Sequence, residues 1–444
     1  MGSWGVLKSC LGFALFAMFA HPAVARSPFD GKPINYSTAS LNDSVLLLQK
    51  KLEQGEVGFE FDDQHGYLRS VLKHLHVPIS SQGLVFSKTS FQRPHISPKK
   101  PRAIYFGDDV YVGWVQQGEV IEISSVDPQL GAVFYTIEQE QSTKPRFKRR
   151  IESCMICHSS SLGQRVPGHV VQSIFPDHSG LPITGSRRFR SDHTSPLRER
   201  WGGWYVTGTH GDQRHLGNML ISSRDAIDNL DLEKGSNVID LSSRLDTSPY
   251  LSNFSDIVAL MVLEHQTTMH NFITAVNYEA RRAIYEEKSI KDQLAEPSDQ
   301  LNPITQLRIN NAAEQLVKYL LFAEETQLTS PIDGTSSFRR DFSKQGPRDD
   351  RGRSLRDFDL RTRLFKYPCS YLIYSQSFDA LPVAVKDQVY RRLWEILNGK
   401  DQGKTFETLS ESDGQAILEI LKETKSEMPE YWEPGRKPAS LKKM

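Results

Sequence analysis

Residues 101–137 read PRAIYFGDDVYVGWVQQGEVIEISSVDPQLGAVFYTI and contain four short runs rich in β-branched and aromatic residues. GDD at 107–109 separates the first two runs, and DPQLG at 127–131 separates the last two. β-Branched and aromatic residues favour strands, whereas Gly, Pro and Asp favour the turns between them. With a further candidate strand at 84–86, this stretch predicts an antiparallel meander of four or five strands.

The chain around this meander has a helical pattern. Two short helices are expected before it, around residues 43–54 and 65–76. Residues 256–285 contain no Gly or Pro, and their apolar residues recur with the 3.6-residue period of a helix. Further helices are expected at 303–326, 383–398 and 404–424, and a polar exposed loop at 328–356. The sequence therefore predicts an α+β fold with an N-terminal antiparallel β-meander, a loop-rich middle segment and a mainly α-helical C-terminal half.

The N-terminus has the features of a secretory signal peptide. An apolar run, LGFALFAMFA at 11–20, is followed by the small residues Ala23 and Ala25. This run is short for a membrane span, so cleavage after Ala25 is expected, with a retained anchor as the alternative. We predict a signal peptide at 1–25, an N-terminal region with the sheet at 26–144, a loop-rich segment at 145–225 and a helical region at 226–444. The mature protein should be periplasmic or otherwise exported, without a stable membrane span.

Charge and cysteine content restrict the function further. The chain has 54 Lys and Arg and 54 Asp and Glu, so it lacks the basic excess of a nucleic-acid-binding protein. Four cysteines occur, and Cys10 precedes the predicted cleavage site. The three that remain make an odd number, which argues against a disulfide framework.

The segment CMICH at 154–158 contains the chemically informative residues. Cys-x-x-Cys-His is the signature of covalent haem c attachment. Two thiols at this spacing reach two vinyl groups of one haem, and the next residue, His158, can then bind the iron. We expect one covalent haem c, bonded to Cys154 and Cys157, with His158 as an axial ligand.

Two other interpretations of this pair are weaker. A redox Cys-x-x-Cys requires a preceding strand, whereas FKRR at 147–150 is basic. A zinc knuckle requires a second ligand pair, and no other Cys-x-x-Cys occurs in the sequence. Cys369 is interpreted as a small buried residue of an apolar segment.

The second axial ligand is left open by the sequence. His265 lies on the apolar stripe of the 256–285 helix, and His215 lies in a glycine-rich segment; these two are the leading candidates. Met219 ranks behind them, and His169 and His210 are within reach of the chain. The alternatives without iron binding are a hydrogen-bonded core histidine at 265 and a polar loop histidine at 215.

A local excess of arginine follows the attachment motif. One or two of these side chains are candidates for pairing with haem propionates, and the rest are expected on a solvated surface. They are Arg187, Arg188, Arg190, Arg198, Arg200 and Arg214.

Several stretches resemble an uncharacterised group of exported bacterial monohaem cytochrome-like proteins. The matching stretches extend over nearly the whole mature chain and are SSQGLVFSKTSFQ, PRAIYFGDDVYVGW, CMICHSSS, RWGGWYVTGTHGDQRHLGN, LEHQTTMHN and RSLRDFDLRTRLFKYPCSYLIYS. The resemblance implies haem c and export, but no substrate. Only Cys154, Cys157 and His158 are carried over as site residues.

The leading functional hypothesis is electron transfer with a periplasmic redox partner. The alternative is a haem-dependent oxidoreductase or peroxidase acting on a small molecule, for which Glu264 and His270 are candidate acid–base groups. A haem sensor, or an exported interaction protein without haem, ranks lowest.

Overall fold

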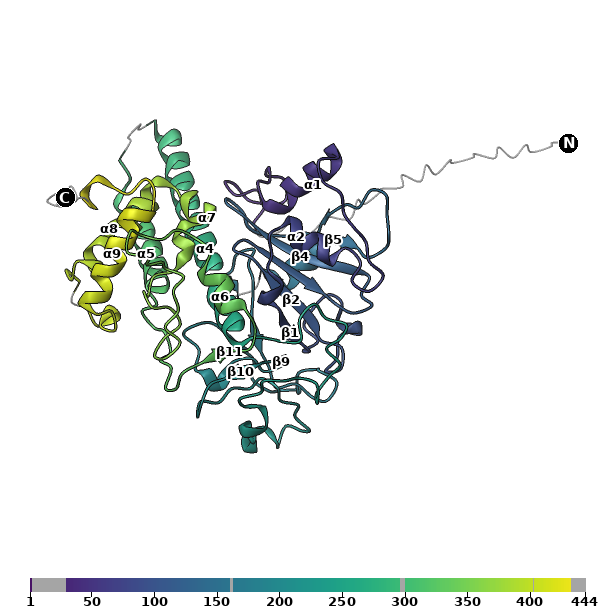
Figure 1. The fold of residues 1–444 in the computed structure, drawn as a ribbon. Helices are drawn as coiled ribbons and strands as arrows, with labels where there is room; N and C mark the ends of the chain where they lie inside the picture. The colour runs from purple at the N-terminus through teal and green to yellow at the C-terminus, as the bar shows by residue number, and fades with distance from the viewer. Residues whose placement is uncertain (2–28, 160–162, 296–299, 402, 433–444) are drawn as a thin grey trace.

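The computed structural model describes Met1 and residues 29–159, 163–295, 300–401 and 403–432. A seven-stranded antiparallel sheet forms one side of the protein and helices form the other, which confirms the predicted α+β class with a mainly helical C-terminal half (Figure 1). The predicted signal peptide, apart from Met1, lies outside the described residues. No helix within the described ranges has the length and apolar character needed to cross a membrane.

The predicted meander is present and is longer than expected. The strand order is β6-β5-β4-β3-β2-β1-β9, and every neighbouring pair is antiparallel. The five predicted strands are β1 to β5, and the short strands β6 and β9 extend the sheet at its two edges. The strands are β1 (Gly83–Val85), β2 (Arg102–Phe106), β3 (Val110–Trp114), β4 (Val120–Asp127), β5 (Gly131–Glu138), β6 (Lys148–Arg149) and β9 (Trp204–Tyr205).

The two faces of the sheet bury different partners, because side chains alternate along each strand. The face that includes Tyr105, Val112 and Tyr135 packs with α1 (Ser44–Gln54) and α2 (Leu68–His74). Asp43 caps α1 and also accepts a 2.6 Å hydrogen bond from the Tyr135 hydroxyl. The opposite face, which we call the inner face, includes Phe106 and Tyr111 and packs in one core with α4 (Ile257–Leu294).

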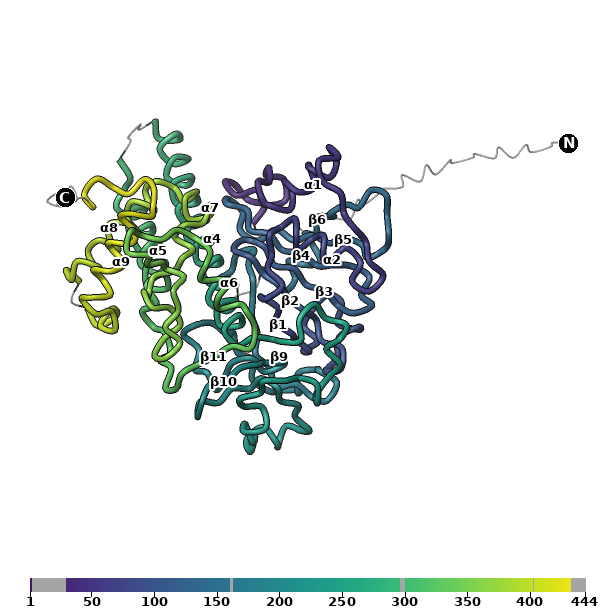
Figure 2. Tube along the Cα trace, viewed as in Figure 1, coloured from purple at the N-terminus to yellow at the C-terminus, as the bar shows by residue number. Residues whose placement is uncertain are grey.

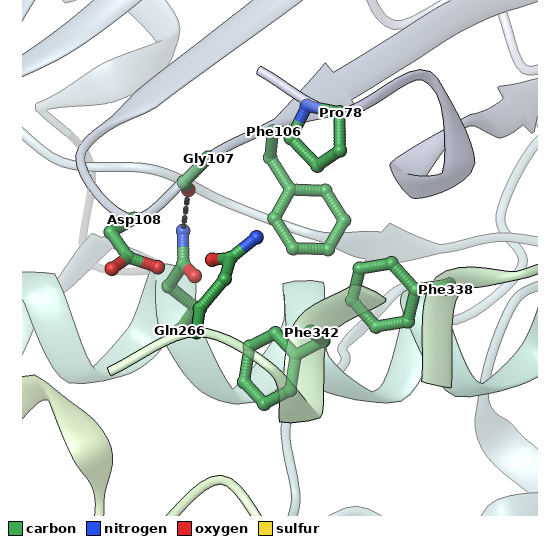
Figure 3. Close-up of a pocket in the computed structure, with 8 residues that line it drawn as sticks. Pro78, Phe106, Gly107, Asp108, Gln266, Phe338 and Phe342 are labelled. Atoms are coloured by element: carbon green, nitrogen blue, oxygen red, sulfur yellow. Dashed lines mark hydrogen bonds between the residues drawn. The ribbon is translucent and has the colours of Figure 1, made fainter. Parts of the chain in front are cut away.

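Helix α4 lies between the sheet and the helices α5 (Pro303–Leu320), α8 (Val383–Leu397) and α9 (Glu411–Thr424) (Figures 1 and 2). Its N-cap, Asp256, accepts hydrogen bonds from the amides of Val258 and Ala259. Where α4 faces the sheet, Gln266 donates a hydrogen bond to the Gly107 carbonyl at 2.8 Å, beside a small hollow (Figure 3). Further helices are α6 (Phe338–Ser343) and α7 (Gln376–Asp379).

Some predicted helix boundaries were wrong. Helix α4 continues to Leu294 because EEKSIKDQL at 286–294 contains no helix breaker. Helix α5 ends at Leu320, shortly before Phe322 takes a positive φ of 56°. Helix α9 begins only at Glu411, where Ser410 accepts a hydrogen bond from the Asp413 amide as N-cap. The predicted loop at 328–356 contains α6.

The segment between β6 and β9 is an excursion that leaves the sheet at one edge and returns at the other. It is loop-rich, as predicted, and β6 and β9 both belong to the sequence region expected to be separate from the sheet. Its regular elements are α3 (Glu152–His158), β7 (Gln172–Ser173) and β8 (Phe189–Arg190), and β10 (Gly208–Thr209) with β11 (Asp333–Gly334) follows it.

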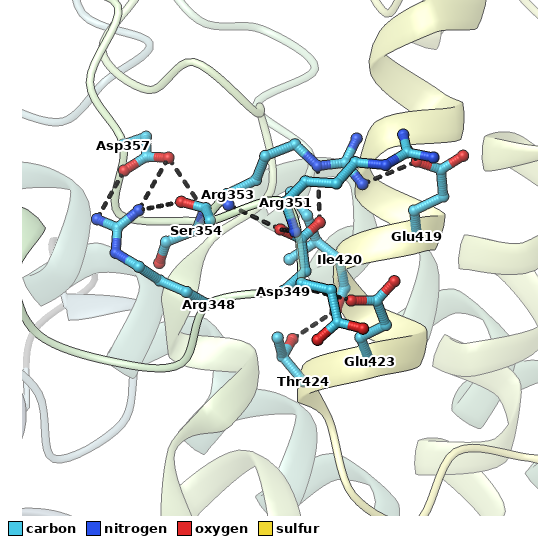
Figure 4. A network of polar contacts seen from close by, with 12 residues as sticks. Arg348, Asp349, Arg351, Arg353, Ser354, Asp357, Glu419, Ile420, Glu423 and Thr424 are labelled. Carbon is cyan, nitrogen blue, oxygen red and sulfur yellow. Dashed lines mark hydrogen bonds and ion pairs between the residues drawn. The ribbon is translucent and has the colours of Figure 1, made fainter.

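A surface network joins the 348–357 loop to α9 (Figure 4). Arg353 contacts Asp349 at 2.7 Å and Glu419 at 2.8 Å, and Arg351 contacts the same Glu419 at 2.9 Å. This loop therefore holds the last helix to the helical half through several shared charges.

Candidate functional site

The attachment motif lies on α3. Cys154, Cys157 and His158 occupy positions i, i+3 and i+4, so they share one face of this short helix. Both cysteines are free thiols; Cys154 is half-buried and Cys157 is exposed. Met155 lies in a core cluster with Phe134 and Tyr36, and Cys154 packs against the same cluster. The helix thus directs Cys154 and His158 towards the core and leaves Cys157 at the surface.

The orientation of the His158 ring is fixed on one side. Its Nδ1 lies 2.8 Å from the Gly168 carbonyl oxygen, and its ring packs against Phe134 with centroids 4.5 Å apart. A carbonyl only accepts, so Nδ1 carries the proton and the lone pair is on Nε2. Nε2 has no hydrogen-bond partner among the described residues. Burial lowers the pKa of His158, which keeps the ring neutral.

The Gly168 carbonyl is itself held by α4. The side chain of Asn271 accepts a hydrogen bond from the His169 amide at 2.8 Å and donates one to the His169 carbonyl at 2.6 Å. Gly168 lies so close to Asn271 that a Cβ at this position would be 2.4 Å from Oδ1. Glycine is therefore required here by the close approach of the two segments.

An ion pair lies beside the motif on the inner face of the sheet. Arg102 Nη2 is 2.5 Å from Glu122 Oε2, and the guanidinium lies over Gly113, where a Cβ would be 2.2 Å from Nη2. Arg102 and Glu122 both influence the pKa of His158, after the larger effects of burial and the Gly168 hydrogen bond. Burial raises the pKa of Cys154, and Glu122 adds to that rise. Two opposite charges therefore face the thiol and the imidazole.

Arg102 retains an unused hydrogen-bond donor. Its Nε is buried and has no hydrogen-bond partner among the described residues, whereas Glu122 also accepts hydrogen bonds from Ser90 at 3.3 Å and Gln92 at 3.2 Å. A buried unpaired guanidinium nitrogen is costly unless another acceptor is present. The sequence analysis missed Arg102. Strand alternation and pairing would have placed it on the same face as Glu122.

The leading candidates for the second axial ligand lie elsewhere. His265 is fully buried, with Nδ1 2.8 Å from His193 Nδ1 and Nε2 2.8 Å from the Ser370 hydroxyl. His215 is also buried, and its Nδ1 accepts a hydrogen bond from the Gly217 amide at 3.0 Å. Within the described ranges no hydrogen bond or ring contact joins either imidazole to His158, so their role as iron ligands stays a prediction.

The weaker candidates are also engaged in other contacts. His169 shares Phe134 with His158, but its Nε2 lies 2.7 Å from the Ser124 hydroxyl. Both nitrogens of His210 are hydrogen-bonded, to the Gln213 carbonyl and the Asn237 amide. In the described part of the chain, His169 is thus the histidine whose ring shares a neighbour with His158.

Three of the six singled-out arginines form ion pairs with described residues. Arg200 is buried against Glu264 at 3.3 Å, and Arg190 contacts Asp192 at 2.8 Å. Arg214 contacts Glu233 at 2.6 Å on the surface. Arg102, which is half-buried, is the arginine paired with Glu122 beside the motif.

No protein-family model, curated protein or solved structure matches the chain. The function must therefore be argued from the site alone. In the ranges that the structure describes, no group of three or more His, Cys, Asp and Glu side chains is arranged to hold a metal ion. One imidazole beside two thiols suits a metal that a macrocycle already holds.

Proposed function

We propose that this protein is an exported c-type cytochrome that carries one haem and transfers electrons. The supporting observation is the His158 ring, whose Nδ1 is engaged by the Gly168 carbonyl and whose Nε2 is unpartnered, on the helix face that presents Cys154 and Cys157. Hydrogen bonding of the second ring nitrogen orients a metal-binding imidazole and increases its basicity. The donor set therefore fits a covalently attached haem.

Each residue has a defined task in this proposal. Cys154 and Cys157 would hold the haem through thioether bonds, and His158 would bind the iron through its Nε2 lone pair. The Gly168 carbonyl fixes the tautomer and the ring plane. The unpaired Nε of Arg102 is available to a haem carboxylate. A bound haem would supply a one-electron couple, whose potential would depend on the ligands and on nearby charge.

A second candidate is a haem-dependent oxidoreductase or peroxidase. Glu264 and His270 were the expected acid–base groups, but both are at most 2% exposed and packed within the core around α4. The observation in its favour is instead the Arg102–Glu122 pair, a guanidinium and a carboxylate beside the motif. Loss of peroxide turnover in Glu122→Gln, with haem still attached, would support this candidate. Equal turnover in the variant and the wild type would exclude Glu122 as its acid–base group.

The decisive experiment is intact-mass analysis of protein matured in a periplasm that contains the haem-attachment machinery. We expect the added mass of one haem, and its loss in the double variant Cys154→Ala/Cys157→Ala. Cys369→Ala is the matched control, because this thiol is fully buried and far along the chain. A mature polypeptide with no added tetrapyrrole would refute the proposal.

Absorption spectra then test the iron ligand. His158→Ala should alter the ferric and ferrous spectra, because the imidazole that binds the iron is removed. His265→Ala is the matched histidine control, and an unchanged spectrum is expected if this residue serves only the core. The reverse pattern would move the ligand from α3 to α4.

A further inference from the structure

The side of α3 that bears Ile156 and Cys157, which we call the α3 face, reaches the protein surface, whereas Cys154 and His158 lie towards the core. Cys157 is exposed, and Ile156, between the two cysteines, is 81% exposed. A third exposed side chain, Phe91 at 66%, lies between Ser90 and Gln92, which both hydrogen-bond to Glu122 beside the motif. Large apolar side chains exposed beside a functional group are typical of a protein-contact surface. A haem edge bonded to Cys157 would therefore be accessible to another protein.

The charge around this face is mainly positive. Residues 144–165 contain six Lys and Arg but only one acidic residue, Glu152, whereas the whole chain is balanced. Arg149 is half-buried and donates hydrogen bonds to the carbonyls of Tyr36 and Ser37. The other five cations are exposed and are Lys144, Arg146, Lys148, Arg150 and Arg165.

Acidic neighbours only partly neutralise these cations. Arg146 lies 3.3 Å from Glu53, and Lys148 contacts Glu138, but all four side chains are largely exposed. Exposed pairs are weak and screened by salt, so they reduce the positive field without abolishing it. Arg150 and Arg165 flank α3 in the sequence and make no ion pair with a described residue.

We propose that the α3 face, with Ile156 and Cys157 at its centre and Arg150 and Arg165 at its rim, is the docking surface for an acidic protein that exchanges one electron with this cytochrome. The inference rests on the proposed function for the electron exchange. The exposed apolar centre excludes water at the contact, and the cationic rim steers an acidic partner towards it.

A second basic surface provides the contrast. Arg339, Arg340, Lys344 and Arg348 line a broad hollow around α6. Each of its arginines contacts an aspartate, respectively Asp333, Asp341 and Asp357. No thiol or imidazole lines this hollow. It serves as a matched control, with comparable charge and no redox group.

The charge at Cys157 can be measured without haem. The full mature chain with Cys154→Ser, made without the attachment machinery, leaves Cys157 as the accessible thiol, since Cys369 is fully buried. The measured quantity is the rate of its alkylation by anionic iodoacetate divided by the rate with neutral iodoacetamide. The thiolate fraction cancels in this ratio. We expect this ratio to fall about threefold to tenfold between low and high salt, or at low salt in Arg150→Glu/Arg165→Glu. Arg339→Glu/Lys344→Glu should leave it unchanged.

Docking itself is tested with polyglutamate as the acidic polypeptide. At low salt it should slow the alkylation of Cys157 by iodoacetamide in the parent chain and in the α6 control, but not in Arg150→Glu/Arg165→Glu. Polylysine should give no protection. A salt-insensitive ratio, no protection by polyglutamate, or equal protection in all three proteins would overturn the proposal.

The two proposals can fail separately. If charge steering and protection are seen but the periplasmically matured protein carries no haem, the cytochrome assignment fails and the surface remains an acidic-protein site. If haem is attached but steering is absent, the docking inference alone fails.

Discussion

His158 and His265 are both histidines on helices, but they differ in whether a ring nitrogen is left without a hydrogen-bond partner among the described residues. One nitrogen of His158 is engaged and the other has no partner among the described residues, on a half-open face with two thiols. Both nitrogens of His265 are engaged, by His193 and Ser370, in an enclosed core. The difference shows that burial alone does not indicate a ligand. A free lone pair with a fixed orientation is the more informative sign.

The largest expected loss of stability is at Arg200, in the core that contains His265. Arg200→Met removes the donor to Glu264 and to the carbonyls of His193 and Ser195. Because these acceptors stay buried, we expect a loss of about 3–5 kcal/mol in the free energy of unfolding, measured by urea denaturation. The exposed Arg198→Met should change it by less than about 0.5 kcal/mol. Similar losses in both variants would show that the Glu264 cluster does not stabilise the core.

A second test concerns Asn271, through which α4 contacts the segment that orients His158. Asn271→Ala leaves the amide and the carbonyl of His169 without their partners, at a cost of about 2–4 kcal/mol in unfolding free energy. It should also loosen the Gly168 carbonyl that orients His158, so the reduction potential of the haem-loaded protein should shift. Asn277→Ala, on the same helix, is the control, since its side chain makes only long hydrogen bonds with described residues, to Ala380 at 3.5 Å and from Arg281 at 3.3 Å. A potential unmoved by Asn271→Ala would mean that α4 does not position the ligand.

The third test uses pH. Burial, only partly offset by Arg200, raises the pKa of Glu264 to about 8, above its unfolded value. The native state therefore keeps a proton that the unfolded chain releases, so this contribution to stability is complete at low pH and is lost as the pH rises towards about 8. The slope is at most about 1.4 kcal/mol per pH unit. Urea midpoints between about pH 5 and about pH 8 measure it, and Glu264→Gln should remove it.

The buried histidines act in the opposite direction. Burial lowers the pKa of His193 and His265 well below the ordinary value. Their contribution is present above the unfolded pKa of about 6.5 and is lost as the pH falls below it.

Equal pH slopes for the wild type and Glu264→Gln would show that Glu264 does not hold its proton in the native state.

The smallest effect is expected at the surface network of the helical half. Glu419→Gln removes the carboxylate charge shared by Arg351 and Arg353, which should cost about 0.5–1 kcal/mol. Thermal unfolding at low and high salt measures the difference, which should shrink as salt screens the charges. A cost as large as that of Arg200→Met would mean that burial does not determine how much a charged group contributes to stability in this protein.

The sequence was most informative where structure is local. Turn residues at 107–109 and 127–131 located the meander, and the apolar period located α4. Strands β6 and β9 were missed because each has two residues, and their pairing with β5 and β1 carries more weight than their own propensity. Likewise CMICH could be recognised from the sequence because its residues are contiguous. Gly168, Asn271 and Arg102 could not, because they act through contacts between distant segments. The apolar stripe that made His265 a candidate ligand describes the core equally well.

The short edge strands have a consequence for self-association. An open sheet edge can pair with the edge of another molecule, and very short terminal strands are one protection against such growth. Here both edges are closed by the ends of the excursion that bears Cys154 and Cys157, at β6 and β9. If this excursion detaches, β5 and β1 are uncovered together. Chains in which the excursion has detached should therefore aggregate through their sheets.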